Sequence, residues 1–166
     1  TALKLDMETN YPWDGHVKIT MIEVPTSEYS FHLRIPGWAD GTQVRINNGP
    51  YTDDLKSRTY LTLSRMWESG DTIEIEFPME VRLVRSHPLV EENRNHVAVM
   101  RGPVVYCIES SDFPAEVKAS EIYLSEKSQF ESRFAGDVLG GVTLLETEVF
   151  RLERTGEASL YSSFDS

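Results

Sequence analysis

The sequence contains a single cysteine, Cys107, among its 166 residues. One cysteine cannot form a disulfide within the chain, and a zinc site built from several thiolates is excluded with it. Basic residues are also scarce, because 16 Lys and Arg stand against 27 Asp and Glu, which gives a formal net charge of -11. Nucleic-acid binding depends on neutralising phosphates with Lys and Arg, and anionic membranes attract the same residues. The charge balance therefore argues against nucleic acid and a membrane surface as partners.

Long apolar runs are absent too, since no stretch of the sequence reaches the roughly 18 residues needed to cross a bilayer. Residues 1–6 lack the basic and then apolar layout of a signal peptide, and there is no initiator Met. We therefore expect a processed or excised piece of a larger protein. The cysteine count leaves the compartment open, with a periplasmic or secreted location favoured for the parent protein.

The dominant pattern is an alternation of apolar and polar residues with a period of two. Val17, Ile19 and Met21 alternate with Lys18 and Thr20. This alternation is typical of half-buried antiparallel strands, whereas no long window shows the 3.6-residue period of a helix. The same pattern predicts further strands over residues 31–35, 44–46, 60–63, 73–77 and 80–83.

Glycine, proline and asparagine mark the turns between these runs. Residues 47–50 read Asn-Asn-Gly-Pro, a turn that tolerates positive φ. Residues 97–109 contain two apolar runs around Arg101-Gly102-Pro103, where Gly and Pro break or bend strand pairing. In the more polar segment that follows, residues 126–134 are the best candidate for a short helical turn, and a strand is expected over residues 142–152.

Many short strands with regularly spaced turns favour a sandwich or a barrel. We predict an all-β fold, an antiparallel two-sheet β-sandwich that is jelly-roll-like and has little helix. A chain of this length can bury a sizeable hydrophobic core without disulfides. The expected organisation is a single β-sandwich domain over residues 1–166.

Six short features occur in a recognisable order along the chain. Each is weak alone, but their shared order over the length of a typical domain is specific. They are residues 11–15 (YPWDG), 33–39 (LRIPGWA), 44–47 (VRIN), 65–71 (RMWESGD), 98–109 and 139–142 (LGGV). Taken together, they resemble the β-sandwich region that follows the catalytic barrel in glycoside hydrolase family 127, the β-L-arabinofuranosidase-like proteins.

The resemblance implies a division of labour within a parent protein. Family members look like an α/α barrel that carries catalysis, joined to β-sandwich domains that do not. Their active site uses a cysteine nucleophile beside a zinc ion held by one glutamate and cysteines, all supplied by the barrel. The resemblance therefore implies no catalytic residue, metal or cofactor in this chain, zinc only in a barrel outside it, and that barrel as the partner domain. This chain is interpreted as the middle domain, with a further C-terminal segment expected after it.

Polar residues that could support chemistry also have plain structural interpretations. Cys107 lies in an apolar run without a cationic neighbour in the sequence, so we interpret it as a small buried hydrophobe. A calcium ion held by loop oxygens, including those of Asp53, Asp54 or Asp71, is an open alternative. The remaining groups are interpreted as solvated surface residues without metal-ligand spacing: His16, His32, His87, His96, Glu74 with Glu76, Glu91 with Glu92, and Asp53 with Asp54.

Aromatic residues are the main candidates for a functional surface. Rings beside turns either stack on the C–H faces of sugars or pack against another domain. We favour packing, with nearby arginines expected to brace the contacts through salt bridges. The candidate rings are Trp13, Trp38, Tyr51 and Trp67, and the arginines are Arg34, Arg45, Arg65 and Arg101.

Three functions follow from these observations. The preferred one is a non-catalytic accessory domain of a glycoside hydrolase acting on plant-type glycans, whose parent hydrolyses terminal β-L-arabinofuranosides, as the resemblance implies. The alternative is a carbohydrate-binding module, which requires an exposed strip of Trp and Tyr and makes carbohydrate a second candidate partner. A third, an autonomous carboxylate hydrolase, requires two carboxylates about 5 to 10 Å apart across a pocket.

Overall fold

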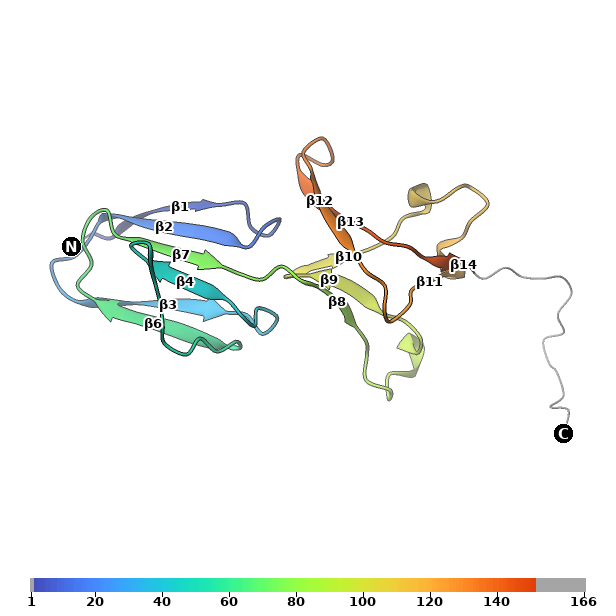
Figure 1. Ribbon diagram of the computed structural model, residues 1–166, viewed down its shortest axis with the longest axis horizontal. Coiled ribbons are helices and arrows are strands. Elements are labelled where there is room, and N and C mark those ends of the chain that lie inside the picture. Colours follow the sequence, from blue (N-terminus) through green and yellow to red (C-terminus); the bar gives the residue numbers. More distant parts are fainter. Residues whose placement is uncertain (1, 152–166) are drawn as a thin grey trace, which may run out of the picture. The chain divides into compact units, whose positions relative to one another are not determined.

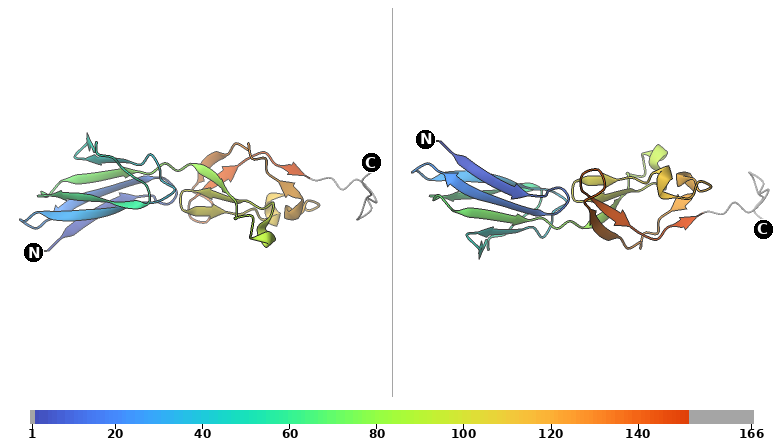
Figure 2. Two further views of the ribbon diagram at one scale, coloured as in Figure 1. Left: turned by 90° about the horizontal axis from the view of Figure 1, so that it is seen from below. Right: turned by 90° about the horizontal axis from the view of Figure 1, so that it is seen from above.

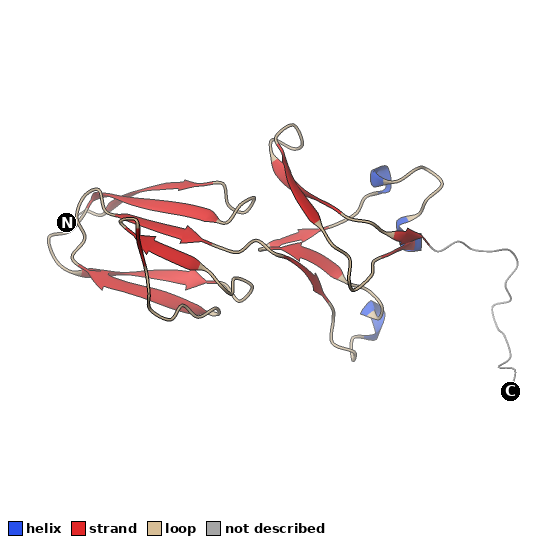
Figure 3. Cartoon of the chain, in the orientation of Figure 1, coloured by secondary structure: helices blue, strands red, loops and turns tan. Residues whose placement is uncertain are grey.

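The computed structural model describes residues 2–151 of the chain. Within this range the regular structure consists of β-strands and three 3-10 helices of three residues each (Figure 3). No helix in this part of the chain is long and apolar enough to span a membrane. The predicted all-β fold with little helix is confirmed.

The chain divides into two compact units. Among the described residues, the first contains 2–106 together with 134–143, and the second contains 107–133 together with 144–151. This differs from the single sandwich expected over residues 1–166. The alternating runs behind that expectation lie before residue 84, whereas the strands that follow residue 106 pair among themselves.

The first unit contains a sandwich of two antiparallel sheets. Its larger sheet has the strand order β1-β2-β7-β4-β5, and its smaller sheet pairs β3 with β6 (Figure 1). Figure 2 shows the same blue to green strands from two further sides. Every strand predicted between residues 17 and 77 is present. The bounds are β1 Lys4–Thr9, β2 His16–Glu23, β3 Tyr29–Ile35, β4 Gln43–Ile46, β5 Gly49–Pro50, β6 Thr59–Arg65 and β7 Thr72–Glu76.

The strand pairs are nested along the sequence. The pair β4–β5 lies inside β3–β6, which lies inside β2–β7, and successive pairs alternate between the two sheets. Nested antiparallel pairs that alternate between two sheets are the arrangement of a jelly roll. The predicted jelly-roll-like topology is therefore confirmed for this unit.

The hydrophobic core lies between the two sheets. Its most deeply buried large side chains are Met21, Ile35 and Ile73, each at most 1% exposed. They come from β2, β3 and β7, so both sheets contribute. Full burial of such a side chain is worth about 1.5–3 kcal/mol, which makes this layer the main attraction between the sheets. The other large members are Ile19, Val44, Leu61, Leu63, Trp67, Ile75 and Phe77.

Two turns predicted from the sequence are confirmed by the backbone. Asn47 and Asn48 have φ values of 50° and 63°, and Ile46 pairs with Gly49 across them. Gly102, with a φ of 53°, turns the chain between β9 (Ala98–Arg101) and β10 (Val104–Tyr106). Asparagine and glycine adopt this left-handed region with less strain than other residues, which is why these positions end the strands.

A three-stranded sheet with the order β10-β9-β8 also belongs to the first unit. The strand β8 (Val81–Val84) is joined to β9 by a segment that contains the helix η1 (Glu91–Asn93). The strand β10 ends at Tyr106, so the apolar run predicted to continue to residue 109 stops earlier. Cys107 is exposed rather than buried, because it follows the last paired residue.

The segment after residue 106 contains short strands and helical turns. The helical turn predicted over residues 126–134 is wrong, because Glu131–Ala135 forms strand β12, which pairs with β13 (Val142–Glu146). The strand expected over residues 142–152 is interrupted after Glu146, and residue 152 lies outside the described residues. The remaining elements are η2 (Ser110–Asp112), η3 (Ala119–Glu121), β11 (Ile122–Tyr123) and β14 (Phe150–Arg151).

Candidate functional site

The strand β1 presents apolar side chains on the core side of the larger sheet. Leu5 pairs with Met21, and Met7 pairs with Ile19. Residues directly opposite one another on neighbouring strands share a face of the sheet, so Leu5 and Met7 lie on the face that bears the core. Their side chains belong to the inner layer of the sandwich.

These two side chains are nevertheless exposed. Leu5 is 38% and Met7 is 59% exposed, whereas Ile19 and Met21 beside them are 6% and 0% exposed. The larger sheet has five strands and the smaller sheet has two, so the smaller sheet leaves the inner face of β1 uncovered within residues 2–151. We name Leu5 and Met7 the β1 patch.

The outer face of the same sheet is charged and polar. One cross-strand row runs from Glu8 through Lys18 and Glu74 to Arg45, with alternating sign. The Nζ of Lys18 lies 3.6 Å from Oε2 of Glu8. Opposite charges on neighbouring strands stabilise a sheet modestly, and this row keeps the outer face in water. The exposed apolar side of β1 is thus its inner side alone.

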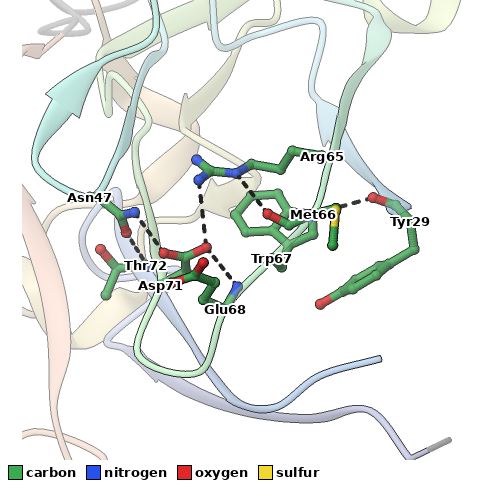
Figure 4. Close-up of polar contacts among 8 residues, drawn as sticks. All are labelled: Tyr29, Asn47, Arg65, Met66, Trp67, Glu68, Asp71 and Thr72. Carbon is green, nitrogen blue, oxygen red and sulfur yellow. Dashed lines mark hydrogen bonds and ion pairs between the residues drawn. The ribbon is translucent and has the colours of Figure 1, made fainter. Parts of the chain in front are cut away.

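A polar network joins the turn after β4 to the loop before β7 (Figure 4). The side-chain amide of Asn47 donates a hydrogen bond to Asp71 Oδ1 at 2.7 Å, and the amide N–H of Glu68 donates to Asp71 Oδ2 at 3.0 Å. Asn47 Oδ1 accepts a hydrogen bond from the backbone N–H of Thr72 at 2.8 Å. Asn47 and Asp71 therefore close one end of the sandwich.

The same contacts set the charge state of Asp71. Burial alone would raise the pKa of this carboxyl, but the hydrogen bonds from Glu68 and Asn47 and the nearby guanidinium together lower that pKa. The guanidinium belongs to Arg65, whose Nη2 lies 3.8 Å from Asp71 Oδ2. The carboxylate that was considered as a calcium ligand is thus engaged by protein donors.

Trp67 lies in the core beside this network. Its side chain is 3% exposed, and its Nε1 donates a hydrogen bond to the Tyr29 carbonyl oxygen at 3.3 Å. The Phe31 ring meets it edge to face at 5.2 Å, and the Arg65 guanidinium lies 5.1 Å from its ring centroid. Burial, and then the charge of Asp71, raise the pKa of Tyr29.

Trp38 and Tyr51 are half-buried and pack against the core. The ring centroid of Trp38 lies 5.8 Å from that of Phe77. Burial raises the pKa of Tyr51, and the hydrogen bond and negative charge of Asp53 raise it further. Part of the ring surface of both residues is therefore buried in contacts within the sandwich.

Trp13 is half-buried, and its backbone carbonyl is an acceptor for two side chains. Arg101 Nη1 donates to it at 2.9 Å, and the buried Thr143 Oγ1 donates at 3.0 Å. The turn that carries Trp13 is thereby tied to β9 and β13 within the first unit. Of the arginines expected to form salt bridges, Arg101 uses this carbonyl instead.

The other two arginines are placed on the sheet surfaces. Arg34 lies on the outer face of β3, with its guanidinium 5.5 Å from the ring centroid of Tyr60 on β6. Arg45 belongs to the charged row on the larger sheet. Of the four arginines, Arg65 is the one that forms an ion pair with Asp71.

Glu74 and Glu76 lie on the outer face of β7, at a shallow depression of about 80 Å³. His16, across from Glu76, places its Nδ1 3.3 Å from Glu76 Oε2. His32 on β3 lies 3.0 Å from the Thr62 hydroxyl, measured from its Nδ1. Each of these histidines is therefore paired with one neighbour on the sheet surface. Asp53, Asp54, His87, Glu91, Glu92 and His96 are exposed.

Within residues 2–151, no three His, Cys, Asp or Glu side chains come together as metal ligands. The exposed Cys107 is therefore not part of a metal-ligand cluster among the described residues. The zinc site that the resemblance places in a catalytic barrel requires several thiolates and a glutamate. The described residues, with Cys107 as their one thiol, do not match that set of ligands.

The nested sheets and their shared core define the first unit as an antiparallel β-sandwich of the jelly-roll class. The family model described as "Beta-L-arabinofuranosidase, GH127 middle domain" matches residues 1–79, and that described as "Glycoside hydrolase family 127 C-terminal domain" matches residues 81–152. The chain belongs to glycoside hydrolase family 127. The resemblance is confirmed, and residues from 81 onward, interpreted above as part of the middle domain, match the family's C-terminal domain.

Named relatives agree with this assignment. A non-reducing end beta-L-arabinofuranosidase of Bifidobacterium longum subsp. longum is 34% identical over 160 residues, which cover 91% of this chain and 24% of the relative. The crystal structure of a GH127 beta-L-arabinofuranosidase from Geobacillus stearothermophilus T6 matches with a TM-score of 0.85 and 34% identity, over 98% of this chain and 26% of that one. A further structure, of a glycoside hydrolase, matches with a TM-score of 0.87 and 34% identity, over 97% of this chain and 27% of that one. The chain thus spans about a quarter of the length of these relatives.

Proposed function

We propose that this chain is a non-catalytic, structural part of a larger glycoside hydrolase, held to the rest of the enzyme through the β1 patch. The parent enzyme removes terminal β-L-arabinofuranosyl residues, the activity for which the relatives from Bifidobacterium longum and Geobacillus stearothermophilus are named. The rest of the parent chain is the occupant of the patch. The observation that carries this proposal is the exposure of Leu5 and Met7 on the core side of the sheet.

Physical chemistry supports this choice of occupant. Apolar side chains on the inner face of a sandwich lower the free energy only when another layer covers them. The relatives are about four times longer than this chain, so a parent of their length has ample further chain to supply that layer. The outer face of β1 carries the charged residues Asp6 and Glu8, which are solvated, whereas its inner face carries the apolar Leu5 and Met7.

The positions of the aromatic candidates support a structural role over sugar binding. Trp67 is in the core, and Trp38 and Tyr51 pack against it. Sugar binding through stacked rings needs ring faces that remain open to solvent. We propose that Trp13, Trp38, Tyr51 and Trp67 stabilise the sandwich and its domain contacts.

The proposal is tested by placing a charge in the patch. Met7→Glu should lower the stability of the full-length parent by about 1–3 kcal/mol, because a carboxylate would be buried against another layer. In the 166-residue chain alone, where Met7 is 59% exposed, the same change should cost less than about 0.5 kcal/mol. Thermal unfolding of both proteins measures the difference.

The matched control is Glu8→Gln on the outer face of the same strand, which should have little effect in either protein. Equal effects of Met7→Glu in the parent and in the short chain would overturn the docking role. Hydrolysis of arabinofuranosides by the 166-residue chain alone would overturn the non-catalytic role. The two halves of the proposal can thus fail separately.

A further inference from the structure

The second unit contains a groove of about 590 Å³. It lies between two stretches of chain, residues 125–131 and residues 146–150. The lining residues are Ser125, Lys127, Ser128, Gln129, Glu131, Glu146, Thr147, Glu148 and Phe150. A volume of this size lies within the range of small-molecule sites, and it accommodates more than a few water molecules.

The two sides of the groove are fixed to each other. The Thr147 hydroxyl donates a hydrogen bond to the Gln129 carbonyl oxygen at 2.7 Å. Arg133 Nη2 and Nε contact Glu146 Oε1 at 3.0 and 3.3 Å. These contacts join the two sides of the groove.

One aromatic residue lines the groove, and a second is its cross-strand neighbour. Phe150 lines it and is 65% exposed, and Tyr123 pairs with Phe150 across β11 and β14 and is 49% exposed. The two strands lie side by side in Figure 1. Directly opposite residues project from the same face with Cβ atoms about 5 Å apart. Two open rings therefore stand on one face, next to hydrogen-bonding groups.

We infer that this groove is a binding site for a neutral oligosaccharide. Sugar rings present C–H faces that pack on Phe150 and Tyr123, and sugar hydroxyls donate to carboxylates and amide oxygens. Glu131, Glu148 and Gln129 are exposed at the groove and supply those acceptors. The site is separate from the β1 patch and from the aromatic residues of the sandwich.

Charge selects the neutral class of sugar. The lining contains three glutamates against one lysine, and the whole chain carries a net charge of -11. Uronic acids and other anionic ligands are repelled by such a lining. Glu146 is already paired with Arg133, which leaves Glu131 and Glu148 to receive hydroxyl groups.

The test is titration of the 166-residue chain with neutral arabino-, xylo- and galacto-oligosaccharides and with oligogalacturonate as the anionic probe. Calorimetry should show saturable binding of a neutral probe and weaker or no binding of the uronate. Amide chemical shifts should move at residues 125–131 and 146–150. Phe150→Ala and Tyr123→Ala should each weaken binding about tenfold or more.

Tyr60→Ala is the matched control, because Tyr60 is an aromatic residue of similar exposure (57%) on the sandwich. It should leave binding unchanged. Absence of binding in a chain shown to be folded, preference for the uronate, or shifts confined to residues outside the groove would each overturn the inference. Shift mapping on the unmodified chain locates the ligand even where a substitution impairs folding. None of these results depends on the docking role of the β1 patch.

Discussion

The side-chain amide of Asn47 lies 2.7 Å from the carboxylate of Asp71 and links two loops that are 24 residues apart in the sequence. Asn47 has a left-handed backbone conformation and follows β4, whereas Asp71 precedes β7. One short hydrogen bond thus fixes where two adjacent strands of the larger sheet meet. The stability of that junction depends on an ionised carboxylate.

Stability of the first unit should fall with acid because of Asp71. Its pKa is lower in the folded chain than in the unfolded one, so the stabilisation is complete above the unfolded pKa, about 3.9. It is lost as the pH falls through that value toward the folded pKa. Asp71→Asn should lower the free energy of unfolding by about 1–3 kcal/mol at neutral pH. It should also reduce the fall of that free energy between neutral and acidic pH.

Urea denaturation of the chain between about pH 3 and pH 7 measures this effect. Asp54→Asn is the control, because Asp54 is exposed and its ion pair with Lys56 lies at the surface. If the free energy of unfolding falls equally steeply with acid in Asp71→Asn and in the unmodified chain, Asp71 is not the source of the pH dependence.

Gly15→Ala should be much more damaging than Gly41→Ala. A Cβ at Gly15 would overlap the backbone carbonyl oxygen of Phe77, which cannot move without breaking the end of the β2–β7 pairing. Gly41 has a φ of 85° but nothing within 4 Å of a Cβ, so only the conformational cost applies. We expect a loss of at least about 2 kcal/mol for Gly15→Ala and about 1 kcal/mol for Gly41→Ala. Thermal melts of the two variants decide this, and equal losses would show that the close approach is relieved by movement of the backbone.

Trp67→Ala should be among the most destabilising single changes in the sandwich. It removes a side chain that is 3% exposed, together with its hydrogen bond to the Tyr29 carbonyl. Large cavities of this kind cost about 3–5 kcal/mol. Tyr60→Ala, which truncates an aromatic residue that is 57% exposed, should cost less than about 1 kcal/mol. Comparable losses in equilibrium unfolding would contradict the central place of Trp67 in the core.

The strands of the sandwich could be predicted because one face of each is buried. Alternation marks such strands directly, as in Val17, Ile19 and Met21. The strand β1 carries the same signal, since Leu5 and Met7 alternate with Asp6 and Glu8, although it was not among the predicted strands. What the sequence could not show is that the layer opposite β1 is missing from the described part of this chain.

The second unit was harder to predict for a physical reason. Its strands are short, and strand β12 is almost entirely exposed, so residues 126–134 lack a buried face with a period of two. The groove depends on Phe150 and Tyr123 meeting across strands of two residues each. Pairing between segments 27 residues apart is a property of the folded chain, and neither ring has a local pattern that marks it.

The nested strand pairs set an order in which the sandwich can assemble. Closing β4–β5 involves a loop of only two residues, whereas β2 and β7 are far apart until the inner pairs have formed. Because the entropy cost of closing a loop grows with its length, each inner pair shortens the effective loop of the next. We therefore expect folding to proceed outward from the Asn47-Asn48 turn. During synthesis the core cannot close until β7 has emerged from the ribosome, so its residues up to Trp67 remain unpacked throughout that interval.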